Sequence, residues 1–116
     1  MRPRTSAAAV ALGALALVVP LASPASAAEG DFHYRYTGLN GQPQPGVLVD
    51  PPSQRCVVIP EAANPGSSSP AFGPRNDTGS VAIVYTEPDC TGQSFRLRPH
   101  GEQTTDRLQL RSVIFS

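Results

Sequence analysis

The chain has 116 residues with nine basic and nine acidic side chains, and its formal net charge is zero. This length allows one small domain. Two of the nine basic residues lie in the first four positions, which leaves seven arginines against nine acidic residues in the rest of the chain. The chain therefore lacks the basic excess that binds nucleic acid or an anionic membrane surface, and we expect neither as a partner.

The amino-terminal residues have the pattern of a secretory signal peptide. "MRPR" is basic, an apolar run covers residues 7–19, and the small residues of "ASPASAAEG" follow. The apolar run of about 13 residues is shorter than the roughly 20 that a membrane-spanning helix needs. We predict a signal peptide over residues 1–27, with cleavage after Ala27 or Ala28, and a secreted, extracellular mature chain without a membrane anchor. We expect residues 28–31 to fray.

The two cysteines, Cys56 and Cys90, both lie in the predicted mature chain. In an oxidising compartment such a pair favours a disulfide. Free thiols and metal ligands are the alternatives, but no histidine lies near either cysteine in the sequence, so the pair is a poor zinc set. We predict a Cys56–Cys90 disulfide, which would support a domain of about 88 residues with a modest core.

No long segment of the mature chain has a helical period. Short apolar or alternating runs are instead separated by turn signals. The expected strands lie in "DFHYRYTG" (31–38), "GVLVD" (46–50), "RCVVIP" (55–60), "SVAIVYTE" (80–87), "QSFRLR" (93–98) and "LQLRSVIFS" (108–116). This pattern predicts an all-β fold, a small antiparallel Greek-key sandwich that forms a single domain over residues 31–116.

Three local features refine this prediction. The alternation in "QSFRLR" predicts that Phe95 and Leu97 point inward and that the two arginines point outward. The alternation of the last segment slips near Arg111–Ser112, which predicts a bulge or a bend. The stretch "EAANPGSSSPAFGPR" (61–75) is rich in proline, glycine and serine, and it predicts a long loop.

The segment that begins at Tyr85 has a spacing of special residues that resembles a βγ-crystallin Greek key. Tyr85 is followed by Cys90 and Gly92, and Ser112 directly precedes "VIF". In that family an aromatic residue, a second aromatic residue and a glycine precede a serine near the last strand. The resemblance implies a folded hairpin whose corner needs a positive φ at Gly92. It also implies that Tyr85 covers the hairpin and that the Ser112 hydroxyl bonds the backbone of the corner.

The resemblance covers residues 81–115, one Greek key, and this sequence departs from the pattern in two ways. Cys90 replaces the second aromatic residue, so we expect a disulfide to Cys56 to do what ring stacking does in the family. The upstream half lacks the aromatic residue and the glycine, and another small β-sandwich stays an alternative. The resemblance extends to small secreted bacterial proteins, which include disulfide-bonded metalloprotease inhibitors and a killer-toxin-like group.

"NDTGSV" (76–81) is similar to the calcium motif of many microbial βγ-crystallins and fits five of its six positions. The candidate ligands are Asn76, Asp77 and Ser80. Val81 stands where the last serine belongs, and Arg107 and Leu108 occupy the acidic positions of the partner key. An arginine repels a cation, and the same residues favour a turn. We expect a turn here, with no metal and no cofactor.

The two histidines, His33 and His100, are the candidate general bases. We expect His33 on the strand face opposite the aromatic residues and His100 in the turn "PHGE", and neither lies beside a recognisable serine or cysteine nucleophile. The scattered carboxylates leave a small hydrolase open. A domain of about 85 residues nevertheless has little room for both a core and a substrate cleft. We therefore predict that the protein is not an enzyme and assign no catalytic residue.

The loop that follows Cys56 is the remaining candidate for function. The disulfide would hold one end of this loop, and preorganisation lowers the ordering cost of binding, although a solvated linker has the same composition. The candidate binding residues are Glu61, Asn64, Pro65 and Phe72. We expect a monomeric, non-enzymatic interaction module, inhibitor-like or toxin-like, whose partner is an extracellular protein such as a protease. The alternative is a structural or stress-related extracellular protein with no dedicated partner.

Overall fold

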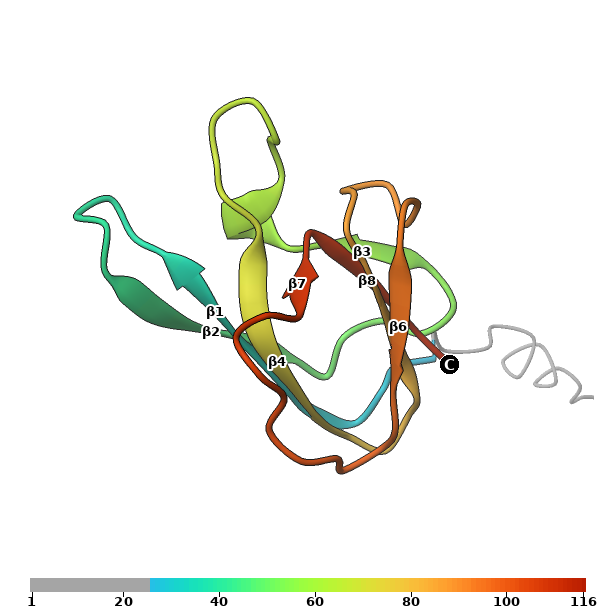
Figure 1. Ribbon diagram of the computed structural model, residues 1–116. Helices are drawn as coiled ribbons and strands as arrows, with labels where there is room; N and C mark the ends of the chain where they lie inside the picture. Colours follow the sequence, from blue (N-terminus) through green and yellow to red (C-terminus); the bar gives the residue numbers. More distant parts are fainter. Residues whose placement is uncertain (1–25) are drawn as a thin grey trace, which may run out of the picture.

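A computed structural model describes residues 26–116, which form two four-stranded antiparallel sheets (Figure 1). The predicted signal peptide lies outside these residues apart from its last two positions. The all-β fold predicted from the sequence is confirmed. One short 3₁₀ helix, η2 (Pro60–Ala62), is also present. Among the described residues there is no helix long and apolar enough to cross a membrane.

Each half of the chain contributes three strands to one sheet and one strand to the other. The first sheet has the order β2-β1-β4-β7 and consists of β2 (Pro43–Val49), β1 (Gly30–Thr37), β4 (Ala71–Thr78) and β7 (Gln109–Leu110). The second sheet has the order β3-β8-β5-β6 and consists of β3 (Cys56–Val58), β8 (Ser112–Phe115), β5 (Ala82–Tyr85) and β6 (Ser94–Leu97). Strands β3 and β7 are thus exchanged between the two halves.

The core lies between the two sheets, and a row of aromatic rings runs through it. The rings of Phe32 and Phe115 meet edge to face with centroids 5.3 Å apart, and Tyr34 and Tyr36 continue the row along β1 at spacings of 6.4 and 6.3 Å. The alternation that predicted β1 places these β1 rings on its inner face. The other buried hydrophobic residues are Ala28, Ile59, Ala62, Ala71, Ala82, Val84, Leu97, Leu110 and Val113.

Strand β4 corrects the sequence prediction, because residues 71–75 were expected to belong to a loop. The strand pairs with β1, and the register shifts between His33 and Arg35. Gly73 lies opposite this irregularity with a φ of 59°, and Pro74 follows it. A β-bulge can accommodate a residue with a positive φ and a residue without an N–H. The strand can therefore continue through Gly73 and Pro74, although glycine followed by proline usually indicates a break.

The amino-terminal end of the described chain also differs from the prediction, because residues 28–31 do not fray. The Ala28 side chain is fully buried, and its N–H donates to the carbonyl of Pro51 at 2.7 Å. Strand β1 then begins at Gly30, whose N–H donates to a carboxylate oxygen of Asp50. The folded domain therefore begins before residue 31.

Only one of the two β6 residues that were predicted to point inward is buried. Leu97 is buried, whereas the Phe95 side chain on the same face is 52% exposed. Phe95 lines a hollow together with Leu108 and with Gln109 of β7, which is only two residues long. The chain crosses from β7 in the first sheet to β8 in the second at Arg111, where the sequence predicted a bulge or a bend.

Candidate functional site

A disulfide joins Cys56 at the start of β3 to Cys90 in the β5–β6 connection, with Cα atoms 5.9 Å apart. This confirms the predicted pairing. The bridge ties the edge strand β3 to the hairpin that follows β5. It also lies close to the segment that leads into η2.

The β5–β6 connection turns at a sharp corner. Gly92 has a φ of 86°, the positive value expected at this position. A β-carbon there would lie against the side chains of Thr86 and Glu87, which leaves no room for a larger residue. The Ser112 hydroxyl accepts a hydrogen bond from the N–H of Cys90 at 2.9 Å and donates one to the carbonyl of Glu87. Ser112 therefore connects β8 to the corner.

The chain between η2 and β4 forms a projecting turn (Figure 1). Its tip, residues 63–67, is exposed along its whole length, and we call it the 63–67 loop. Asn64 organises it: its side-chain oxygen accepts the N–H of Gly66, and its carbonyl accepts the N–H groups of Ser67 and Ser68. The Ser68 hydroxyl donates to the same carbonyl at 2.6 Å.

Arg111 holds both ends of the 63–67 loop. Its guanidinium donates to the carbonyl of Ala62 at 3.0 Å on one side, and to the carbonyl and hydroxyl of Ser68 at 2.9 and 3.3 Å on the other. The side chain is only 8% exposed. Among residues 26–116 no carboxylate lies within ion-pair distance of it, so backbone and hydroxyl oxygens are its hydrogen-bond partners. A buried cation thus fixes the width of the loop at its base.

The four predicted binding residues do not form one surface. Asn64 and Pro65 lie in the 63–67 loop, and Glu61 precedes it in η2. Glu61 accepts a hydrogen bond from the hydroxyl of Tyr34 at 2.7 Å, and burial together with this bond raises the pKa of Tyr34. Phe72 lies in β4 instead, with the Arg35 guanidinium 5.3 Å from its ring centroid. The 63–67 loop therefore contains two of the four residues, Asn64 and Pro65.

The predicted metal ligands have structural partners. Asn76 is buried, and its amide nitrogen donates to the carbonyls of Ser80, Leu97 and Arg98 at 2.7, 3.3 and 3.1 Å. Its amide oxygen accepts the hydroxyl of Thr78 at 2.7 Å. Within residues 26–116 no group of three or more histidine, cysteine or acidic side chains is placed to hold a metal ion. The segment 76–80 is organised around the Asn76 side chain.

The two histidines lie near Asp77 and apart from the 63–67 loop. His100 contacts the Asp77 carboxylate through Nδ1 at 2.9 Å, and Arg75 approaches the other carboxylate oxygen at 3.6 Å. The hydrogen bond from His100, with the charge of Arg75, lowers the pKa of Asp77. His33 pairs with Arg75 across the β1–β4 ladder. This group is largely exposed, and charge pairing at a sheet surface accounts for its geometry.

Arg111 is the functional candidate that the sequence did not identify. The slip in alternation at Arg111–Ser112 predicted an irregular backbone there, but it did not indicate which residues the Arg111 side chain would bond. Those partners lie 49 and 43 positions away, at Ala62 and Ser68. A contact of this range is set by the fold and not by local sequence.

Comparisons with known protein families, with curated proteins and with solved structures give no match to this chain.

Proposed function

We propose that this protein is a secreted, non-enzymatic domain of βγ-crystallin-like fold that binds another extracellular protein through the 63–67 loop. The observation that carries the proposal is the buried Arg111 guanidinium, which bonds Ala62 and Ser68 at the two ends of the loop. Burying a charged side chain is costly, above all in a domain with a small core. A need for a loop of fixed shape in an interaction module accounts for this cost.

The fold part of the proposal is supported by two features. Strands β3 and β7 are exchanged between the halves of the chain, an arrangement compatible with two paired Greek keys. The corner at Gly92 and its bond to Ser112 have the geometry that the resemblance implies. Secretion is supported by the disulfide, because such bridges persist in oxidising compartments.

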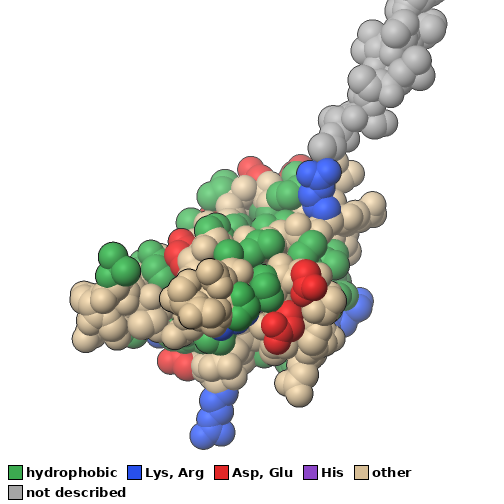
Figure 2. Space-filling view, turned by 90° about the horizontal axis from the view of Figure 1, so that it is seen from above, with side chains coloured by type: hydrophobic (Ala, Val, Ile, Leu, Met, Phe, Trp, Pro, Cys, Tyr) green, Lys and Arg blue, Asp and Glu red, His purple; other side chains and the backbone are tan. Residues whose placement is uncertain are grey.

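The binding part is supported by the character of the loop. Its residues are Ala63, Asn64, Pro65, Gly66 and Ser67, none of which is charged. Figure 2 looks onto the face from which the loop projects, and uncharged side chains cover most of that face. A projecting, uncharged and preorganised turn is suited to a concave site on a partner, because little ordering entropy is lost when it binds. An extracellular protease, with its substrate cleft, is the partner class that this shape fits.

The test uses the mature protein immobilised and exposed to culture supernatant of the producing organism. The matched variants are Ser67→Arg, which adds a bulky charge at the loop tip, and Gln42→Arg, which adds one at the exposed β1–β2 turn. We expect a protein to be retained by the wild type and by Gln42→Arg but lost with Ser67→Arg, and proteolysis of casein in the supernatant to fall when the wild type is added. Equal retention by all three proteins, or retention of nothing, would contradict the proposal.

A further inference from the structure

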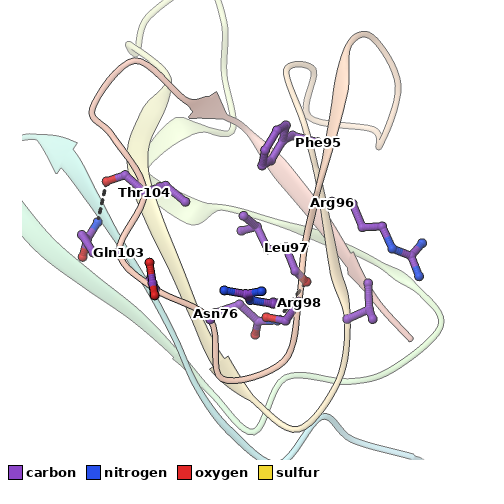
Figure 3. Close-up of a pocket in the computed structure, with 10 residues that line it drawn as sticks. Asn76, Phe95, Arg96, Leu97, Arg98, Gln103 and Thr104 are labelled. Carbon is purple, nitrogen blue, oxygen red and sulfur yellow. Dashed lines mark hydrogen bonds between the residues drawn. The ribbon is translucent and has the colours of Figure 1, made fainter.

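A groove runs along the edge strand β6, away from the 63–67 loop. One part has a volume of about 550 Å³ and is lined by β6 and by residues 101–104. The adjoining part has a volume of about 260 Å³ and is lined by β6, Leu108 and Arg107. Phe95 lines both parts. Figure 3 shows Phe95 and Leu97 pointing into the space between β6 and the segment that carries Gln103 and Thr104.

Both walls of this groove are fixed by hydrogen bonds to β4. On the β6 side, the Asn76 amide donates to the carbonyls of Leu97 and Arg98. On the opposite side, the Gln103 amide donates to the carbonyl of Gly73 at 2.7 Å, and Thr104 donates to the carbonyl of Pro74. The groove is therefore preformed, and a ligand would not need to order its walls.

Strand β6 leaves part of its backbone unpaired. The N–H of Thr86 donates to the carbonyl of Gln93, so this pair is hydrogen-bonded, and in an antiparallel ladder the bonded pairs alternate. Phe95 and Leu97 accordingly bond to β5, whereas the backbone groups of Ser94 and Arg96 face away from it. Such an edge accepts a further strand.

The other three edge strands are less suited to this role. Strand β2 contains Pro43 and Pro45, which lack an N–H, and β3 and β7 are only three and two residues long. Proline and short length are common means of blocking an edge. Among the described strands, β6 is therefore the edge best able to pair.

The charged residues of the groove indicate what kind of peptide strand could pair with β6. Arg98 lines the first part together with one carboxylate, Glu102, and Arg107 lines the second part, so arginines are in excess. No carboxylate in residues 26–116 forms an ion pair with either guanidinium. Arg96 also lines the first part, but its side chain points away from those of Phe95 and Leu97 (Figure 3). Strand β6 and the residue after it carry Arg96 and Arg98 and no acidic side chain, so pairing β6 with a second copy of itself would bring arginines together. A second copy is disfavoured, and an acidic segment is favoured.

We propose that this groove binds an extended acidic peptide segment of a partner protein, which adds a strand to β6. The backbone of the segment bonds Ser94 and Arg96. Its apolar side chains pack on Phe95 and Leu97, and its carboxylates pair with Arg98 and Arg107. Main-chain bonds supply affinity in this mode of recognition, and alternate side chains supply specificity. The site is separate from the 63–67 loop and does not depend on its function.

The experiment titrates the isotope-labelled mature protein with the peptide acetyl-Glu-Val-Glu-Val-Glu-Val-Glu-amide and follows amide chemical shifts. We expect saturable shifts in β6 and residues 103–109, and none in the 63–67 loop. The variant with Arg98→Gln and Arg107→Gln should bind about three- to tenfold more weakly, as expected for two exposed ion pairs. Arg96→Gln is the matched control, since it removes a charge from the same strand on the other face, and its affinity should stay within about twofold of the wild type.

Two further peptides distinguish strand addition to β6 from non-specific binding. A version with lysine in place of glutamate should not bind, and a version N-methylated at alternate residues should lose binding because it cannot donate to the β6 carbonyls. The proposal is wrong if millimolar acidic peptide leaves β6 unshifted, if the N-methylated peptide binds equally well, or if Arg96→Gln weakens binding as much as the double variant.

Discussion

The hydroxyl of Ser112 accepts a hydrogen bond from the backbone N–H of Cys90 at 2.9 Å. The same hydroxyl donates to the carbonyl of Glu87, so one side chain of β8 satisfies two backbone groups of the β5–β6 corner. Gly92 and Cys90 both have a positive φ in this corner, and Cys90 joins the corner to β3 through the disulfide. Two residues from distant parts of the chain, Ser112 and Cys56, thus hold the same turn.

Gly92→Ala and Ser112→Ala should each destabilise the domain. The alanine at position 92 would need a left-handed backbone that costs about 1 kcal/mol or more, and loss of the Ser112 hydroxyl leaves backbone groups unpaired at a cost of about 1 to 3 kcal/mol. The double variant should lose less than the sum, because both changes release the same corner. Urea unfolding of the four proteins measures this. Strict additivity would show that the two residues act independently.

The double variant Cys56→Ser, Cys90→Ser should also lose stability. The bridge closes a loop of 34 residues, which corresponds to roughly 3 to 4 kcal/mol in the chain-entropy model. The thermal unfolding midpoint of the variant, compared with that of the oxidised wild type, tests this value. A variant as stable as the wild type would mean that the other contacts of β3 and the corner suffice.

The stability of the domain should fall above about pH 10, and Tyr34 should contribute to the fall. Burial and the bond to Glu61 raise the pKa of Tyr34 in the folded state, so above the ordinary tyrosine pKa of about 10 the unfolded chain loses a proton that the native chain keeps. Stability present below that pH is then lost as the pH rises.

The matched comparison is Tyr34→Phe. At neutral pH the wild type should be the more stable by about 0.5 to 1.5 kcal/mol, the value of one hydrogen bond. This difference should shrink as the pH rises past about 10, because phenylalanine does not titrate. Chemical unfolding at a series of pH values measures it. A difference that is independent of pH would contradict the predicted shift.

Arg111→Met should destabilise the domain more than an ordinary surface change. The substitution keeps much of the apolar stem but leaves the carbonyls of Ala62 and Ser68 without their donor, which costs roughly 2 to 3 kcal/mol. Arg96→Met, at an exposed position, is the control and should change stability by no more than about 0.5 kcal/mol. Equal unfolding free energies for the two variants would show that Arg111 does not support the loop.

Local pattern was sufficient for those parts of the fold that follow a regular alternation. The inward row of Phe32, Tyr34 and Tyr36 predicted β1 correctly because the period of a strand is a local property. Strand β4 was missed because Gly73 and Pro74 resemble a break, and only the bulge against β1 makes them compatible with a sheet. Its pairing partner is distant in the sequence, so no local signal could reveal it.

The same distinction applies to the candidate sites. Gly92 is recognisable because its role depends on its own backbone, and the cysteine pair is recognisable from its number and from the signal peptide predicted before it. The exposure of Phe95 depends on the hollow that it forms with Leu108 and Gln109, and the role of Arg111 depends on a loop more than forty positions away. Both follow from tertiary structure alone.

The central claim is that the 63–67 loop is preorganised for binding and is not a solvated linker. Backbone order parameters from nitrogen-15 relaxation test this most directly at the amides of Ala63, Asn64, Gly66 and Ser67. We predict values near 0.85, as in a rigid backbone, and lower values in Arg111→Met. Values below about 0.6 in the wild type would show a flexible loop and would contradict the claim.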